Sequence, residues 1–300
     1  MRTRDTTLYA AHLIPLAAVW GASYLFIEVA IEELAPTVLM EARLLLATAV
    51  LGALLVARDG GRATWLSLRR LWRPTLVLGF LNAAVPFTLI AWGQTRIDSG
   101  VAGITIATVP IFVVLLALRF RRSERVSGLR LAGVLLGLAG VGVLAGVAPV
   151  GGLAAVVGIV ATTTASLCYA AGTLYTQIKL EDISPILIAL ATTFGGALLL
   201  LPAAAVEAPS SAPSLKVIGA VLALAVLGTA LAQAVYYRMV PLFGSTRASL
   251  ISYVVPPVAL IYGTLLLDEP LTLGAVLGLG LILAGVALGS GAARRRAAVI

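Results

Sequence analysis

Charged residues are scarce in this chain of 300 residues, and their scarcity excludes a soluble globular protein. Only 11% of the residues are charged and 60% are hydrophobic. A soluble domain is about a quarter charged, because its surface faces water. Much of this surface must therefore face lipid. A spanning helix takes roughly 20 apolar residues, so ten such helices would leave only short connections and no separate soluble domain.

Cysteine, histidine and lysine are also nearly absent, which removes several classes of site. The single Cys168 excludes an internal disulfide and a CxxC metal pair, and the single His12 excludes an HExxH zinc site. Neither Lys179 nor Lys216 follows a glycine, so the chain has no P-loop. We therefore predict no catalytic residue, no metal and no cofactor. An intramembrane serine–histidine enzyme is an alternative only through His12.

Ten apolar runs predict an all-α polytopic membrane protein with ten transmembrane helices. They cover roughly residues 11–31, 36–57, 74–93, 99–118, 128–147, 152–177, 185–205, 215–237, 246–267 and 271–290. Spanning β-strands would alternate apolar and polar residues, and these runs do not. The first run follows Arg2 and Arg4 as in a signal peptide. It continues to about Ile31, however, so we expect an uncleaved first helix.

The basic residues predict the orientation of these helices. With the N-terminus in the cytoplasm, eighteen of the 21 basic residues fall on the cytoplasmic side, two fall outside, and Arg43 lies within a span. This asymmetry agrees with the positive-inside rule and places both termini in the cytoplasm. The net charge of +8 is scattered between apolar runs rather than gathered on one face. The sequence therefore predicts no nucleic-acid partner.

The two halves of the chain resemble each other. Gly133 and Gly140 align with Gly278 and Gly285, and Pro110 followed by Glu124 parallels Pro256 followed by Glu269. Five helices per half is an odd number, so the second half enters the membrane from the opposite side. We predict two inverted five-helix repeats, residues 1–148 and 149–300. Such repeats supply the geometry of alternating access.

Proline interrupts two predicted helices near their centres, at Pro110 and at Pro256-Pro257. Matched interruptions in the two halves of a transporter point to its central site. Polar and aromatic side chains at similar depth are predicted to bind substrate there: Trp20, Ser23, Tyr24, Asn82, Thr105, Thr108, Tyr169, Thr173, Gln233, Ser252 and Tyr253. Trp20 is expected opposite Tyr169. Three further aromatic residues, Trp92, Tyr236 and Tyr237, are assigned to interfacial belts.

A predicted charge cluster consists of Glu28, Glu41 and Arg43, all within about two helical turns of the outer surface. Charges inside a membrane need partners. Glu41 and Arg43 are two residues apart and point to different faces, so a pair between Arg43 and Glu28 is favoured, either as a structural lock or as a gate. No lysine or arginine is expected at mid-membrane depth, which argues against a cationic phosphate pocket.

Glycines recur four residues apart in the last helix of each half. The pairs are Gly133/Gly137, Gly142/Gly146, Gly274/Gly278 and Gly285/Gly289. This spacing lets helix backbones approach closely. It predicts that the fifth and tenth helices pack on each other in a monomer; a weak homodimer through the same faces is the alternative.

Several short motifs together resemble a known family. They are Trp20-Gly-Ala-Ser-Tyr-Leu-Phe-Ile27 with Pro36 and Arg43, Asp98-Ser-Gly-Val-Ala-Gly103 leading to Pro110, Gly244-Ser-Thr-Arg-Ala-Ser249 leading to Pro256, Glu124, and Asp268-Glu269-Pro270-Leu271. In order and duplication they are similar to the EamA type of the drug/metabolite transporter superfamily. The resemblance covers the whole chain and implies an exporter of amino acids, metabolites or toxic compounds with a central cavity. The family often has lysine where this chain has Glu28, and a small apolar residue where it has Glu41.

The sequence thus predicts a transporter of the bacterial cytoplasmic (inner) membrane, with the lipid bilayer and a small-molecule solute as partners. It would export small neutral or zwitterionic metabolites, aromatic or other apolar amino acids foremost, by alternating access. Aromatic and hydroxyl side chains suit a ligand with an apolar face and a few polar groups. Alternatives are a multidrug exporter of aromatic cations, through cation–π contacts, and a membrane scaffold that transports nothing.

Overall fold

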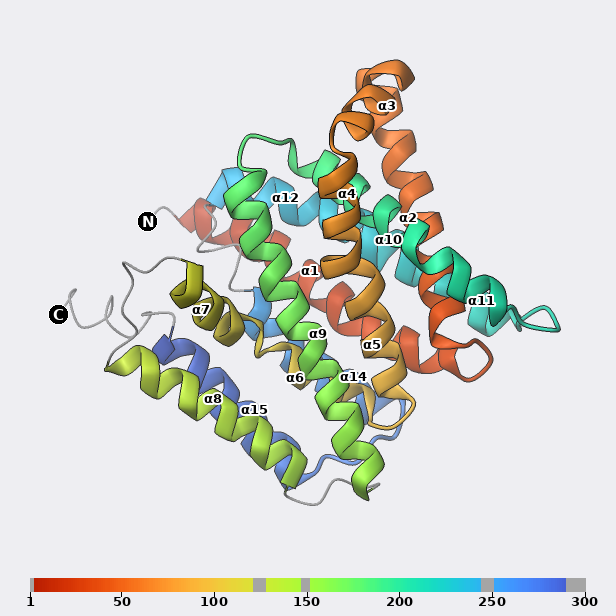
Figure 1. Cartoon of the computed structure of the whole chain (residues 1–300). Coiled ribbons are helices and arrows are strands. Elements are labelled where there is room, and N and C mark those ends of the chain that lie inside the picture. Colours follow the sequence, from red (N-terminus) through yellow and green to blue (C-terminus); the bar gives the residue numbers. More distant parts are fainter. Residues whose placement is uncertain (1–2, 121–127, 147–151, 244–250, 290–300) are drawn as a thin grey trace.

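The computed structural model describes residues 3–120, 128–146, 152–243 and 251–289, and every regular element within them is helical (Figure 1). Six helical segments are long and apolar enough to cross a membrane: Leu8–Ile31, Pro36–Asp59, Trp72–Gln94, Gly152–Lys179, Pro185–Val206 and Leu215–Tyr236. Shorter apolar helices cover Ser99–Val113, Leu131–Leu144, Val254–Leu266 and Leu273–Leu288. The all-helical prediction is confirmed for the described residues. The count of ten spans and their direction stay predictions.

The first half contains α1 (Thr3–Ile31), α2 (Pro36–Asp59), α3 (Gly61–Arg70), α4 (Trp72–Gly79), the π-helix η1 (Phe80–Ala84), α5 (Val85–Gln94), α6 (Ser99–Ile106), α7 (Val109–Phe120) and α8 (Leu129–Gly146). The second half contains α9 (Gly152–Lys179), α10 (Pro185–Val206), α11 (Leu215–Leu222), the π-helix η2 (Ala223–Leu231), α12 (Ala232–Phe243), α14 (Ile251–Leu266) and α15 (Leu273–Gly289). Both π-helices are unbroken continuations of the helices around them.

Local chemistry explains several helix ends. α2 and α10 begin at Pro36 and Pro185, where proline costs no hydrogen bond because the first amides of a helix have no partner inside it. α2 ends at Asp59, and the following Gly60 has a φ of +85°, which suits a residue without a Cβ. Outside the membrane spans, the Ser214 hydroxyl accepts a hydrogen bond from Val217 N at 3.4 Å and begins α11. Hydrogen bonds from Ser214 also hold the pKa of the Glu33 carboxyl below its usual value.

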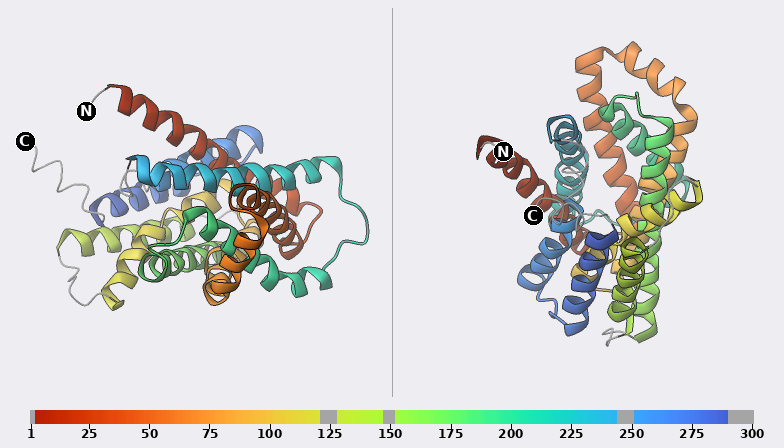
Figure 2. Two further views of the ribbon diagram at one scale, coloured as in Figure 1. Left: turned by 90° about the horizontal axis from the view of Figure 1, so that it is seen from above. Right: turned by 90° about the vertical axis from the view of Figure 1, so that its left-hand side faces the viewer.

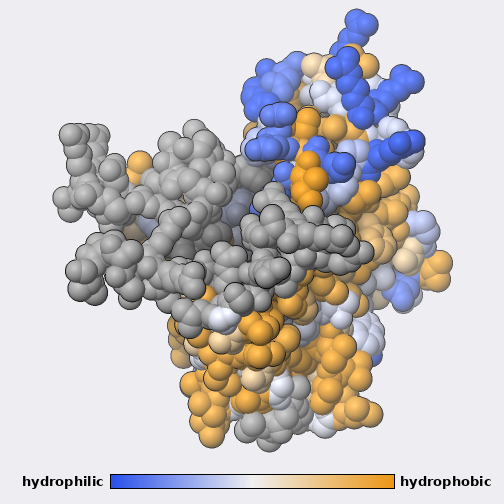
Figure 3. Space-filling model, turned by 60° about the vertical axis from the view of Figure 1, so that its left-hand side comes forward, coloured by the Kyte–Doolittle hydropathy of each residue, from blue (hydrophilic) through white to orange (hydrophobic). Residues whose placement is uncertain are grey.

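Between α2 and α4 the chain forms α3, where the sequence suggested only a connection. Its arginines and Trp65, which is 59% exposed, make an amphipathic helix at one end of the molecule, and Trp72 at the start of α4 is exposed at 56%. Figure 3 shows hydrophilic residues gathered at that end and hydrophobic residues over the flank below. A basic helix with exposed tryptophan is typical of a membrane interface.

The helix predicted over residues 99–118 is interrupted near its centre. α6 ends at Ile106 and α7 begins at Val109, so the break comes just before Pro110. The Thr105 and Thr108 hydroxyls donate to the backbone oxygens of Ala102 (2.7 Å) and Thr105 (2.6 Å). The matching break expected at Pro256-Pro257 is not seen, because α14 continues through both prolines as one helix.

The helices contact one another in a repeated pattern. α1 packs against α14, and α9 packs against α6 and α7. In the same way α2 packs against η2, and α10 packs against α4 and η1. The contact of α1 with α14 thus corresponds to the contact of α9 with α6 and α7. The contact of α2 with η2 corresponds to the contact of α10 with α4 and η1.

Two contacts between helices depend on glycine. Gly195 lets α10 lie directly on α4, because a Cβ there would lie 2.0 Å from the backbone oxygen of Thr75. α8 and α15 lie side by side at one edge of the bundle (Figures 1 and 2). A Cβ on Gly285 would lie 2.5 Å from the backbone oxygen of Gly133, whereas Gly142 faces open space. Glycines of the two predicted faces therefore contact each other within one chain, and the oligomeric state stays a prediction.

Candidate functional site

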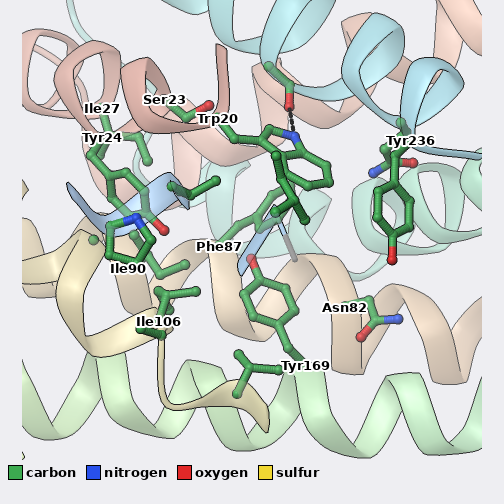
Figure 4. Close-up of a pocket in the computed structure, with 18 of the residues that line it drawn as sticks. Trp20, Ser23, Tyr24, Ile27, Asn82, Phe87, Ile90, Ile106, Tyr169 and Tyr236 are labelled. Atoms are coloured by element: carbon green, nitrogen blue, oxygen red, sulfur yellow. Dashed lines mark hydrogen bonds between the residues drawn. The ribbon is translucent and has the colours of Figure 1, made fainter. Parts of the chain in front are cut away.

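A cavity of about 360 Å³ lies between helices of the two halves (Figure 4). Its volume is within the usual range for small-molecule sites, about 300–1,000 Å³. Eight residues singled out from the sequence line it: Trp20, Ser23, Tyr24, Asn82, Tyr169, Thr173, Gln233 and Pro256. These residues come from α1, η1, α9, α12 and α14, so the tertiary structure brings together side chains that are far apart in the sequence.

The other predicted site residues lie elsewhere in the fold or have side chains outside the described part of the structure. Thr105 and Thr108 are fully buried, donate to the backbone at the break between α6 and α7, and do not line the cavity. Neither Pro110 nor Pro257 is among the lining residues. Ser252 and Tyr253 belong to α14, but their side chains lie outside the described part of the structure.

Aromatic rings form much of the cavity wall. The ring of Trp20 packs on Tyr236 with a centroid separation of 5.5 Å, and Tyr169 meets Phe87 edge-on at 6.4 Å. Trp20 and Tyr169 thus face one cavity, as expected, but each packs on a different ring (Figure 4). The assignment of Tyr236 to an interfacial belt was wrong, because Tyr236 lines the cavity. It lies three residues after Gln233 and therefore shares a helix face with it.

A hydrogen bond that the indole of Trp20 donates to the π-helix η2 orients the ring. Trp20 Nε1 donates to the backbone oxygen of Gly228 at 3.2 Å, shown as a dashed line in Figure 4. A Cβ on Gly228 would lie 2.8 Å from Ser23 Oγ, so glycine allows η2 to approach α1. The other π-helix, η1, carries Asn82. Short π-helices are frequent at functional sites, and here each half of the chain supplies one to the cavity.

Arg43 is not paired with Glu28, contrary to the prediction. Arg43 Nε donates to Thr229 Oγ1 at 2.8 Å, and its guanidinium lies over the ring of Phe87, with Cζ 4.0 Å from the ring centroid. Arg43 also lines the cavity. From helical rise, Arg43 was placed near the outer surface, so no lysine or arginine was expected near the central cavity. In the structure Arg43 of α2 faces the centre of the bundle.

The two acidic members of the predicted cluster have other surroundings. Glu28 Oε2 accepts a hydrogen bond from Gln94 Nε2 at 3.0 Å, and the same amide donates to the backbone oxygen of Tyr24 at 2.9 Å. The Glu41 carboxylate is buried, and within the described residues neither of its oxygens has a hydrogen-bond partner. The three charges therefore form no single cluster.

The cavity residues that sequence reasoning did not assign to the site include Arg43, Phe87 and Thr192. Arg43 was noticed as a charge inside a span, a signal for a functional site, but was assigned a structural partner instead. Phe87 is aromatic and Thr192 is polar, so the signal that pointed to Trp20 and Asn82 was present at both positions but was not used.

Comparison with known proteins identifies the chain. A model of the EamA-like transporter family matches residues 8–146 and again residues 156–290. The chain belongs to the EamA-like transporter family. It is thus a membrane transporter, as the resemblance of its motifs implied.

Individual relatives of this EamA-like transporter cover nearly its whole length. It is 29% identical over 290 residues to the uncharacterized inner membrane transporter YedA of Escherichia coli strain K12, covering 96% of this chain and 92% of the relative. It is 27% identical over 294 residues to a probable amino-acid metabolite efflux pump of the same organism, covering 95% of each. An uncharacterized transporter of Archaeoglobus fulgidus is 27% identical over 267 residues, or 89% of this chain and 93% of the relative. A solved crystal structure shares the fold, with a TM-score of 0.66, 20% identity and coverage of 96% and 98% of the two chains.

Two motifs of this EamA-like transporter meet at one end of the cavity-forming helices. Glu269, in the connection between α14 and α15, accepts hydrogen bonds from the backbone nitrogens of Ser99 (Oε1, 2.6 Å) and Gly100 (Oε2, 2.9 Å). It takes the role of an N-cap, since Asp98 caps α6 with no side-chain hydrogen bond. Burial raises the pKa of the Asp98 carboxyl, and the nearby Glu269 raises it further.

We expect Glu269→Gln to lower the stability of the EamA-like transporter by about 1–2 kcal/mol. The glutamine side chain lacks the negative charge that interacts with the N-terminus of α6. It also offers one acceptor oxygen to the two backbone donors, Ser99 N and Gly100 N. Thermal unfolding of the purified protein in detergent measures this loss. Glu32→Gln is the control, because Glu32 makes only an exposed ion pair with Lys216 at 2.9 Å, a type worth about 0–1 kcal/mol. Equal losses in the two variants would contradict the capping role.

Proposed function

We propose that the chain exports small neutral or zwitterionic metabolites, amino acids foremost, across the cytoplasmic membrane. The observation that carries the proposal is the cavity between the two halves, which has an aromatic wall and neutral hydrogen-bonding groups. Asn82 and Thr173 supply such groups beside the rings of Trp20 and Tyr169. A solute with an apolar body and a few polar groups matches this lining. The similarity to a probable amino-acid metabolite efflux pump supports the same substrate class.

Alternating access between two inverted repeats is part of the proposal. The family model matches two consecutive segments, and the helices of each half contact the other half in corresponding pairs. Both observations support repeats over residues 1–148 and 149–300, ten spans, and a cavity between two elements that can rock against each other. The arginine distribution supports cytoplasmic termini, and the similarity to YedA supports the inner membrane.

The alternative of a multidrug exporter of aromatic cations is less well supported. The described cavity lining contains no acidic residue, and its one charged residue is the cation Arg43. A cationic drug would therefore meet repulsion within the cavity, which cation–π contacts of about 0.5–2 kcal/mol would have to exceed.

Reconstitution tests this function. We expect proteoliposomes loaded with unlabelled L-phenylalanine or L-leucine to take up the same labelled amino acid by counterflow, several-fold above empty liposomes. The measurement is repeated with and without a pH gradient to detect proton coupling. Tetraphenylphosphonium is the control solute, since it is an aromatic cation without a carboxylate. Counterflow of that cation with none of either amino acid would contradict the proposal.

A further inference from the structure

We infer that Arg43 is the residue that selects the solute, by binding a carboxylate group inside the cavity. The inference rests on the proposed function for its transport consequences, but the binding it claims can be measured without transport. It defines the substrate class as solutes in which an apolar or aromatic body carries a carboxylate.

The guanidinium of Arg43 is held in position from three sides. Its Nε donates to Thr229 Oγ1 at 2.8 Å, and its Nη1 donates to Met40 Sδ at 3.8 Å. The Phe87 ring supports its flat face, with Cζ 4.0 Å from the ring centroid. Thr229 is itself fixed, because its hydroxyl donates to the backbone oxygen of Leu224 at 3.0 Å, five residues earlier in η2. A guanidinium held this way loses little conformational freedom on binding a ligand.

Among the described residues, the charge of Arg43 has no anionic partner. Its side chain is only 7% exposed, yet no carboxylate among the described residues lies within ion-pair distance, and Nη2 donates to none of their atoms. A charge within a membrane protein is costly to bury and commonly marks a substrate pathway. Because Arg43 lines the cavity, a solute can supply the missing negative charge.

The surroundings of Arg43 favour a carboxylate over a phosphate. No lysine and no second arginine occurs among the described lining residues. A phosphate carries a charge of about −1.5 to −2 and is usually held by several cationic or amide donors. A carboxylate carries a single charge and matches the fork of one guanidinium. The rings of Trp20 and Tyr169 can then cover the apolar body of the solute (Figure 4).

Three probes separate the chemistries: phenylacetate, 2-phenylethylamine and phenyl phosphate. Each is added to the purified protein in detergent, and the shift of the unfolding temperature is converted to a Kd. We expect phenylacetate to bind at least about tenfold more tightly than 2-phenylethylamine, because a hydrogen bond to a charged group is worth about a factor of 10 to 100. Arg43→Gln should weaken phenylacetate binding by the same factor and leave 2-phenylethylamine unchanged. Arg43→Lys should retain part of the preference, since it keeps the charge without the fork.

The control variant is Arg96→Gln. Arg96 also lies over an aromatic ring, with Cζ 3.5 Å from the Trp92 centroid, but it does not line the cavity. The Arg96→Gln substitution should therefore leave phenylacetate binding unchanged. If Arg43→Gln fails to fold, the Arg43→Lys variant decides. The inference would be overturned if phenylacetate did not bind, if it bound no more tightly than 2-phenylethylamine, or if phenyl phosphate bound more tightly. It would also be overturned if the Arg43 variants left the preference for phenylacetate unaltered. Carboxylate binding without amino-acid counterflow would instead leave the inference standing and reject the proposed function.

Discussion

Replacing Trp20 with alanine is expected to reduce transport at subsaturating solute about tenfold to a hundredfold while the protein remains folded. The indole lines the cavity, packs on Tyr236 at 5.5 Å and is oriented by the Gly228 carbonyl. Burying a large apolar group against a solute is worth about 1.5–3 kcal/mol, and each 1.4 kcal/mol changes affinity tenfold. Asn82→Ala should also impair transport, because its amide faces the same cavity.

Melting temperature and counterflow rate, measured on the same purified variants, test this prediction. Trp20→Phe is the matched variant: it keeps a ring, loses the N–H donor to Gly228, and should retain intermediate transport. Trp92→Ala is the control, because Trp92 contacts Arg96 rather than the cavity, and its effect on transport should be small. A Trp20→Ala protein that is destabilised by a few kcal/mol but fully active per folded molecule would show that the indole only packs helices together.

Replacing Gly195 with alanine should destabilise the fold by about 3 kcal/mol or more, at the upper end of the cost of overpacking. The added Cβ would lie 2.0 Å from the backbone oxygen of Thr75 and 2.7 Å from its carbonyl carbon. Backbone atoms cannot rotate away as a side chain can, so α4 and α10 must separate. α4 continues into η1, which carries Asn82, so transport should fall together with stability.

Gly219→Ala is the matched control, because Gly219 is also helical and a Cβ there meets nothing within 4 Å. That substitution should be neutral or raise stability by up to about 1 kcal/mol, since alanine is the better helix former. Chemical denaturation of both variants in detergent measures the difference. Comparable stability of the two would show that α4 and α10 are not in backbone contact as described.

The prediction of helices succeeded because long apolar runs without alternation have one stable arrangement in lipid. Every regular element in the described residues is helical, and proline begins α2 and α10 at the expected ends of their runs. Prediction of the interruptions was less successful. The helix is interrupted just before Pro110, but α14 continues through Pro256 and Pro257, so a proline in the sequence did not by itself determine where a helix breaks.

The candidate site was predicted in part. Polar or aromatic residues in a lipid-embedded helix stand out from their neighbours, and Trp20, Asn82 and Tyr169 were found for that reason. Thr105 and Thr108 stand out equally, but their hydroxyls donate to backbone oxygens three residues earlier, at the break between α6 and α7. A serine or threonine hydroxyl can bond either to a nearby backbone oxygen or to a group in a cavity, and the sequence does not reveal which partner it has.

By itself, the sequence determined that this protein is helical, embedded in lipid and related to EamA-like transporters, because composition, apolar run length and motif order are properties of the chain alone. Only the tertiary structure decided the partner of Arg43. Helical spacing restricts which residues share a face, but not which neighbouring helix that face meets or how far the helix is rotated. η2 carries Thr229 to the Nε of Arg43, whereas Gln94 binds Glu28. Arg43 therefore faces the cavity with no anion beside it in the described part of the chain, because the contacts between helices, not the spacing within one helix, select the partner of a buried charge.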